Sequence, residues 1–147
     1  MNNNRDEVTI GEIDFGTVSG TGLLMEVSPG RFNLGNPVGK CRIEVYSNEG
    51  QIPHFHIIGE SKSKKFECCP CIYDAVYFNH GTKIDRLSNK QLIILNNWLN
   101  SPCDKFGGAI NNWHIISSLW EMCHNPMTNV PKNPAQPNYS NMINMRN

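Results

Sequence analysis

The sequence reads Ile52-Pro53-His54-Phe55-His56-Ile57-Ile58 and, after a polar stretch, Phe66-Glu67-Cys68-Cys69-Pro70-Cys71. Both runs are short and rich in residues that favour strands, and residues 59–65 between them are typical of a hairpin connection. Successive side chains of a strand point to opposite faces. We therefore expect His54 and His56 on one face of the first strand, and Cys69 and Cys71 together on one face of its partner.

Further patterns on both sides of this hairpin indicate the fold class. Residues 23–27, 41–46 and 72–78 have the composition of strands. Residues 88–91, Ser-Asn-Lys-Gln, form a capping box that opens a helix to about residue 100. A second helix is expected over residues 112–124. The sequence thus predicts an α+β fold, an antiparallel sheet of four to five strands followed by two packed helices.

The two ends of the chain differ from its middle in composition. Residues 1–20 are polar and glycine-rich, which predicts a flexible N-terminal arm. Residues 126–147 carry several prolines and asparagines without an apolar period, which predicts an extended polar tail. Residues 21–125 between them form one expected α+β domain, a usual size for a single core.

Composition narrows the classes of function and the location. The 147 residues include 13 basic and 13 acidic ones, so a nucleic acid or a membrane surface is not expected as a partner. No apolar run approaches the roughly 20 residues of a membrane helix. The first residues lack the apolar region of a secretory signal. We therefore expect a cytoplasmic protein (in the host cytoplasm or a virion if phage-encoded), whose six cysteines are thiols or metal ligands.

The histidines and cysteines of the hairpin are the candidate metal ligands. If the strand register brings the two faces together, His54, His56, Cys69 and Cys71 lie within reach of one tetrahedral zinc ion. Pro70 interrupts the ladder between the two cysteines and indicates an edge or a bulge. The favoured interpretation is packed thiols in a half-buried sheet with no cofactor, and zinc is the alternative.

Two catalytic interpretations use the same residues. A catalytic metal would keep His54 and His56 and add His80 or a carboxylate such as Asp74 or Glu67. A nucleophile pair would join one of the cysteines to one of these histidines, but the sequence identifies no orienting group. No catalytic residue is therefore assigned, and the chain is expected not to be an enzyme.

His114, Ser118 and Glu121 form a polar stripe on the second expected helix, opposite Trp113 and Trp120. Such a stripe is typical of the solvated side of an amphipathic helix. The alternative is an interaction surface.

Residues 43–57, Ile-Glu-Val-Tyr-Ser-Asn-Glu-Gly-Gln-Ile-Pro-His-Phe-His-Ile, resemble the opening of a small bacterial and phage family of unknown function. Its members have a strand, a polar turn and a Pro-Pro-His-Phe-His-like segment, followed by strands and a Trp-containing helical half. Ile52 stands where that family has its first proline. The resemblance covers residues 40–124. It implies a fold and a candidate surface around His54 and His56, and it implies no activity.

These observations favour a non-enzymatic binding or assembly protein, such as an accessory or structural component of a phage or mobile element. The polar ends would wrap a protein partner, a second copy of the chain or a larger assembly. The first alternative is a metal-dependent, hydrolase-like enzyme that uses His54 and His56. The second is a regulator that binds a small ligand, or a defence protein.

Overall fold

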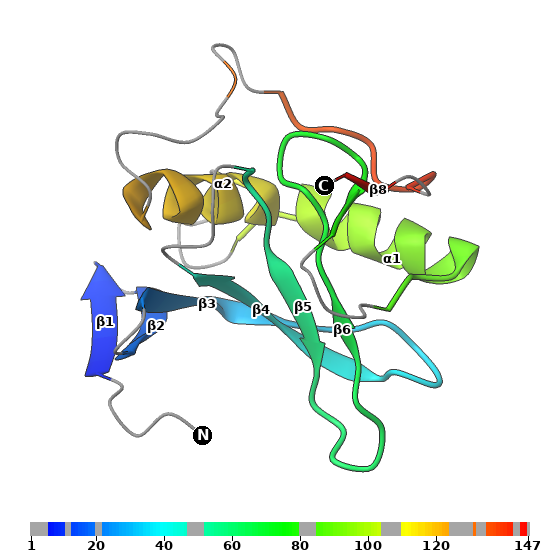
Figure 1. Cartoon of the computed structure of the whole chain (residues 1–147), viewed down its shortest axis with the longest axis horizontal. Helices are drawn as coiled ribbons and strands as arrows, with labels where there is room; N and C mark the ends of the chain where they lie inside the picture. Colours follow the sequence, from blue (N-terminus) through cyan, green and yellow to red (C-terminus); the bar gives the residue numbers. More distant parts are fainter. Residues whose placement is uncertain are drawn as a thin grey trace.

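The computed structural model describes residues 6–10, 13–19, 22–46, 52–79, 85–103, 110–123, 131, 135–142 and 145–146. Within them the chain forms an antiparallel sheet whose strands follow one another in sequence order, together with two helices (Figure 1). The sheet contains β1 (Asp6–Ile10), β2 (Ile13–Ser19), β3 (Gly22–Asn33), β4 (Lys40–Tyr46), β5 (His56–Gly59) and β6 (Glu67–Cys68). The helices are α1 (Asn89–Asn100) and α2 (Asn112–Cys123). The predicted α+β class, an antiparallel sheet followed by two helices, is confirmed.

One face of the sheet contributes to the hydrophobic core. Ile43, Ile57 and Cys68 are neighbours across β4, β5 and β6, and all three are fully buried. They lie on one face because side chains alternate and directly paired residues share a side of the sheet. Several residues of both helices join the same cluster, including Leu92, Leu95, Leu99, Trp113, Ile116, Leu119 and Trp120. The helices therefore cover this face.

The start of α1 follows the predicted capping box. The Ser88 hydroxyl accepts a hydrogen bond from the Gln91 amide, and the Gln91 side chain accepts one from the Ser88 amide. This exchange satisfies two amides that the first helical turn leaves without intrahelical partners. Leu92, Leu95 and Leu99 are buried, as their spacing predicts. Neither α1 nor α2, and no other helix among the described residues, is long and apolar enough to cross a membrane.

The ends of the chain differ from the sequence expectations. Residues 6–19 contain β1 and β2, which pair with each other and extend the sheet beyond β3. Near the other end Tyr139 and Met142 are buried in the core, although the sequence predicts a polar tail there. The burial of these two large side chains, together with the hydrogen bonds of Tyr139 to Cys71, Ile72 and Asn96, holds this stretch against the domain. Beyond them β8 (Met145–Arg146) pairs in parallel with β7 (Tyr77–Phe78).

Candidate metal centre

The register of β5 and β6 decides which side chains meet. Ile57 pairs with Cys68 and Ile58 pairs with Glu67. Continued by one residue, this register places His56 opposite Cys69. The isolated bridge between His54 and Cys71 continues it further. The register that the zinc hypothesis requires is thus present, with both histidines and both cysteines on the strand face opposite Ile57 and Cys68.

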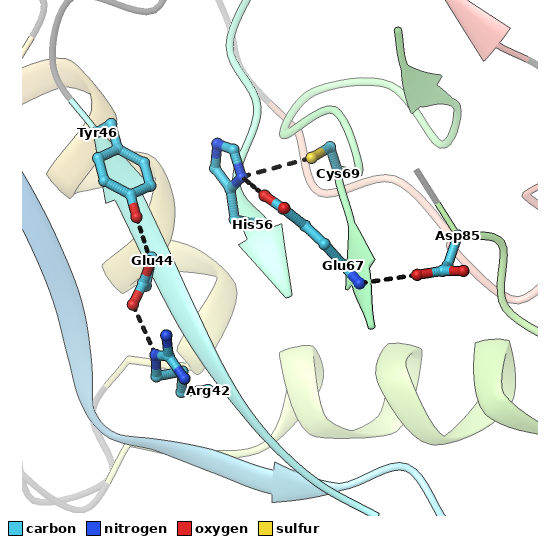
Figure 2. Close-up of polar contacts among 7 residues, drawn as sticks. All are labelled: Arg42, Glu44, Tyr46, His56, Glu67, Cys69 and Asp85. Carbon is cyan, nitrogen blue, oxygen red and sulfur yellow. Dashed lines mark hydrogen bonds and ion pairs between the residues drawn. The ribbon is translucent and has the colours of Figure 1, made fainter. Parts of the chain in front are cut away.

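Three of the side chains on this face bring their donor atoms together. Nδ1 of His56 lies 2.6 Å from Oε2 of Glu67 and 3.5 Å from Sγ of Cys69. The three donor atoms all lie within 4.8 Å of one another. Figure 2 shows the three side chains pointing toward one another from β5 and from the adjacent strand. Imidazole, carboxylate and thiol are the ligand types of protein-bound zinc.

The distances between the donor atoms agree in part with those expected around a tetrahedral metal ion. Metal bonds of about 2.05 Å to nitrogen and 2.3 Å to sulfur place those two atoms about 3.5 Å apart at the tetrahedral angle. The distance between His56 and Cys69 has this value. The shorter distance to Glu67 is that of a hydrogen bond between the imidazole N–H and the carboxylate. A metal would replace this proton, and the carboxylate would move outward by about 0.8 Å.

The three candidate ligands differ in their access to solvent. The His56 side chain is 4% exposed and that of Glu67 is 48% exposed, while Cys69 is fully buried. Glu67 therefore has room for the small outward movement that a metal requires. It also marks the side from which water reaches the group.

A nucleophile pair of Cys69 with His56 does not fit this geometry. A catalytic imidazole accepts the nucleophile's proton at one nitrogen while an orienting carboxylate contacts the other. Here Cys69 and Glu67 both approach Nδ1 of His56. One nitrogen cannot donate to the carboxylate and accept from the thiol at the same time. The arrangement is that of ligands converging on one point.

Two of the four predicted ligands, His54 and Cys71, lie beside this group but outside it. Nδ1 of His54 donates to the carbonyl oxygen of Ile52 over 2.8 Å, and its ring stacks on Phe78 at 4.1 Å. The ring also lies 5.3 Å from that of Trp120 on α2. His54 is fully buried among these aromatic rings. It is therefore a core histidine of the described structure.

Glu67 takes part in the site although the sequence analysis named it only as one of several carboxylates. It lies two residues before Cys69, so it shares that face of the strand. Asp74, the other carboxylate considered, is absent from the group of donor atoms. His80 lies outside the described residues. Period-two spacing from Cys69 was the available signal for Glu67.

A second polar row lies on the neighbouring strand β4, and the sequence analysis missed it. Glu44 pairs with His56 and is only 3% exposed. Its carboxylate accepts from Nε of Arg42 over 2.6 Å and from the hydroxyl of Tyr46 (Figure 2). The ring of Tyr46 then meets the His56 imidazole edge to face, with the centroids 5.0 Å apart. This row therefore holds His56 from the side opposite Cys69.

The backbone of the ligand strand is fixed from its outer side. The Glu67 amide donates to Oδ2 of Asp85 over 2.9 Å, and the Asp85 amide donates to the Glu67 carbonyl over 2.7 Å. The Phe78 amide donates to the carbonyl of Cys69 over 2.7 Å. These hydrogen bonds thus occupy the edge of the sheet at Glu67 and Cys69, and they fix the backbone positions of both ligands.

Five cysteines carry free thiols rather than disulfides, namely Cys41, Cys68, Cys69, Cys71 and Cys103. Burial raises the pKa of the Cys68 thiol well above its ordinary value, and the charge of Cys69 is the second largest cause of this increase. Burial and the Glu60 carboxylate raise the pKa of Cys41 to about 11. These two thiols remain neutral near pH 7 and behave as small apolar side chains.

The polar stripe predicted on the second helix lies on α2 as expected. His114, Ser118 and Glu121 are all exposed. Oε2 of Glu121 accepts from the Tyr73 hydroxyl over 3.2 Å. Burial and this carboxylate raise the pKa of Tyr73. A role of the stripe as an interaction surface stays a prediction.

Comparison with known protein families, with curated proteins and with solved structures found no match to this chain. The resemblance to the family with the Pro-Pro-His-Phe-His-like motif therefore stays a prediction. Any functional interpretation depends on the geometry described above.

Proposed function

We propose that the protein binds a divalent transition metal ion, with Zn²⁺ as the first candidate, through His56, Glu67 and Cys69. The observation that carries the proposal is the convergence of three unlike donor atoms within 4.8 Å at a mostly buried point. A thiolate together with an imidazole favours Zn²⁺ over the harder ions Mg²⁺ and Ca²⁺.

The number of ligands indicates the kind of site. Structural zinc sites are usually closed by four protein ligands, whereas catalytic sites have three and keep a position for water or substrate. Among the residues that the structure describes, His56, Glu67 and Cys69 supply three. Bound there, the ion would supply Lewis-acid chemistry and lower the pKa of a coordinated water. The site thus supports the metal-dependent, hydrolase-like alternative better than a purely structural role.

Cobalt substitution tests the proposal, because a cysteine thiolate bound to Co²⁺ gives a charge-transfer absorption band that other ligands do not give. We expect the full-length protein, without a histidine tag, to bind one Co²⁺ per chain with this band. Cys69→Ser should lose the band because it removes the ligand. Cys71→Ser is the matched control, since Cys71 is equally buried, lies on the same face, and is outside the group.

Two outcomes would count against the site. One is a full-length protein that binds no Co²⁺ and melts at the same temperature in chelator as in Zn²⁺. The other is a band that Cys71→Ser removes and Cys69→Ser keeps. His56→Gln and His54→Gln repeat the comparison on the other strand, and only His56→Gln should weaken binding.

A further inference from the structure

A groove runs beside the candidate metal centre and shares one of its ligands. It encloses about 340 Å³ and is lined by residues that include Ile58, Lys65, Phe66, Glu67 and Asp85. This volume lies at the lower end of the range for small-molecule sites. The groove thus extends from Glu67 along the turn side of the β5–β6 hairpin.

The three ligands differ in solvent exposure, and this difference relates the groove to the candidate metal site. His56 and Cys69 are buried, and Glu67 is the half-exposed ligand. A molecule approaching the open coordination position from solvent therefore passes along Glu67. Glu67 also lines the groove, so the groove and the candidate metal site meet at this residue.

The charges that line the groove indicate the chemistry of its ligand. A divalent ion held by two anionic ligands, Glu67 and Cys69, has no net charge left over. Lys65 then contributes the positive charge of the groove. Asp85 opposes it, but its Oδ2 already accepts from the β6 backbone. Ile58 and Phe66 are the large apolar residues of the lining.

We propose that this groove binds a small organic carboxylate with an apolar body. Its carboxylate would take the open position of the metal near Lys65, and its apolar part would lie against Ile58 and Phe66. This inference rests on the proposed function, because the carboxylate needs the metal as its partner. The Lys65 ammonium favours a carboxylate over a neutral ligand, and a carboxylate oxygen is an ordinary ligand of zinc.

Phenylacetate is the probe, and acetate is its counterpart without an apolar body. Each is titrated into the full-length Co²⁺-loaded protein, and the change in the cobalt absorption spectrum is measured. We expect saturable binding of phenylacetate that is tighter than that of acetate. Lys65→Ala should weaken phenylacetate binding by about threefold or more. Lys64→Ala is the matched control, because Lys64 is exposed in the same connection and is not part of the groove lining.

The sign of the Asp85 effect gives a second test. Asp85→Asn keeps an oxygen for the Glu67 amide and removes the negative charge, so it should tighten phenylacetate binding. Weaker binding in Asp85→Asn, or equal binding in the two lysine variants, would overturn the anionic ligand. Equal affinities for acetate and phenylacetate would overturn the apolar body.

The outcomes also separate this inference from the proposed function. If the protein takes up no Co²⁺, the metal site itself fails and the groove proposal falls with it. If Co²⁺ binds through Cys69 but phenylacetate leaves the spectrum unchanged, the groove proposal alone fails.

Discussion

Glu67 differs from the other two ligands in what holds it in place. His56 is buried and lies against Tyr46 and Cys69. Glu67 is half exposed, and its position depends on its backbone and on the ion pair with His56. A site in which two ligands are fixed and one can move is suited to exchanging a bound water or substrate. The residue most open to solvent is therefore also the residue on which access depends.

Tyr46 supports the centre through a carboxylate rather than by direct contact with the metal. Its hydroxyl donates to Glu44, which is buried, and its ring packs on His56. We expect Tyr46→Phe to lower the free energy of unfolding by about 1–3 kcal/mol, because a buried carboxylate loses a donor. Metal affinity should fall as well, by about tenfold. Chemical denaturation and Co²⁺ titration measure the two effects.

Tyr73→Phe is the control for this change. Tyr73 also donates to a carboxylate, but its partner Glu121 is exposed. The same deletion should therefore cost less than about 1 kcal/mol and leave metal affinity unchanged. Equal effects of the two substitutions would show that the burial of Glu44 has no role.

At the scale of elements, β6 has only two residues of regular pairing, yet it determines the site. Pro70 follows it, and a proline cannot donate to the ladder. Beyond it the Phe55 amide donates to the Pro70 carbonyl and the Ile72 amide to the Pro53 carbonyl, on either side of the bridge between His54 and Cys71. Asp85 covers the outer edge at Glu67. A short, covered edge strand of this kind resists pairing with another chain.

The buried thiol of β6 gives the protein a pH dependence. Because the pKa of Cys68 is raised in the folded state, folding favours the neutral thiol. This contribution is complete below the ordinary thiol value of 9.0. It is lost as the pH rises from that value toward the folded pKa. We expect the free energy of unfolding to fall above about pH 9, and to fall less steeply in Cys68→Ala. Urea denaturation between pH 7 and pH 10.5 measures both slopes, and identical slopes would contradict the role of Cys68.

Much of this hairpin can be predicted from the sequence. The alternation of Pro53 to Ile58 and of Phe66 to Cys71 predicts which side chains share a face, and the register in the structure brings those two faces together. Periodicity cannot choose among ligands that share a face. That choice depends on where Pro53 and Pro70 end regular pairing, and on Phe78, a residue distant in sequence that stacks on His54. The sequence does not indicate the role of Glu44, because a polar residue at an alternating strand position is expected on the solvent-exposed face.

At the scale of the whole molecule, residues 135–142 join both halves of the domain. The Tyr139 hydroxyl donates to the carbonyl oxygens of Cys71 and Ile72, over 2.8 and 2.7 Å. The Tyr139 amide donates to Oδ1 of Asn96 on α1. The segment thus connects the cysteine strand to a helix. Composition alone could not reveal this, because the contacts depend on two apolar residues within a polar stretch.

Deletion of residues 131–147 tests this connection. Removing Tyr139 and Met142 exposes core surface and leaves the carbonyl of Cys71 without its hydroxyl donor. We expect a loss of about 5 kcal/mol or more, comparable to the stability of many domains. Thermal denaturation measures it. A truncated protein that melts like the full-length chain would show that the segment is dispensable. The solution mass of both forms tests whether this end also supports assembly, which stays a prediction.

The metal content of the purified protein tests the central claim most directly. The full-length chain, expressed without a histidine tag and analysed by elemental mass spectrometry, should contain close to one zinc ion per chain. Cys69→Ser should contain almost none, and Cys71→Ser should match the unaltered protein. A protein that lacks stoichiometric metal and gains none after incubation with Zn²⁺ would contradict the assignment of His56, Glu67 and Cys69.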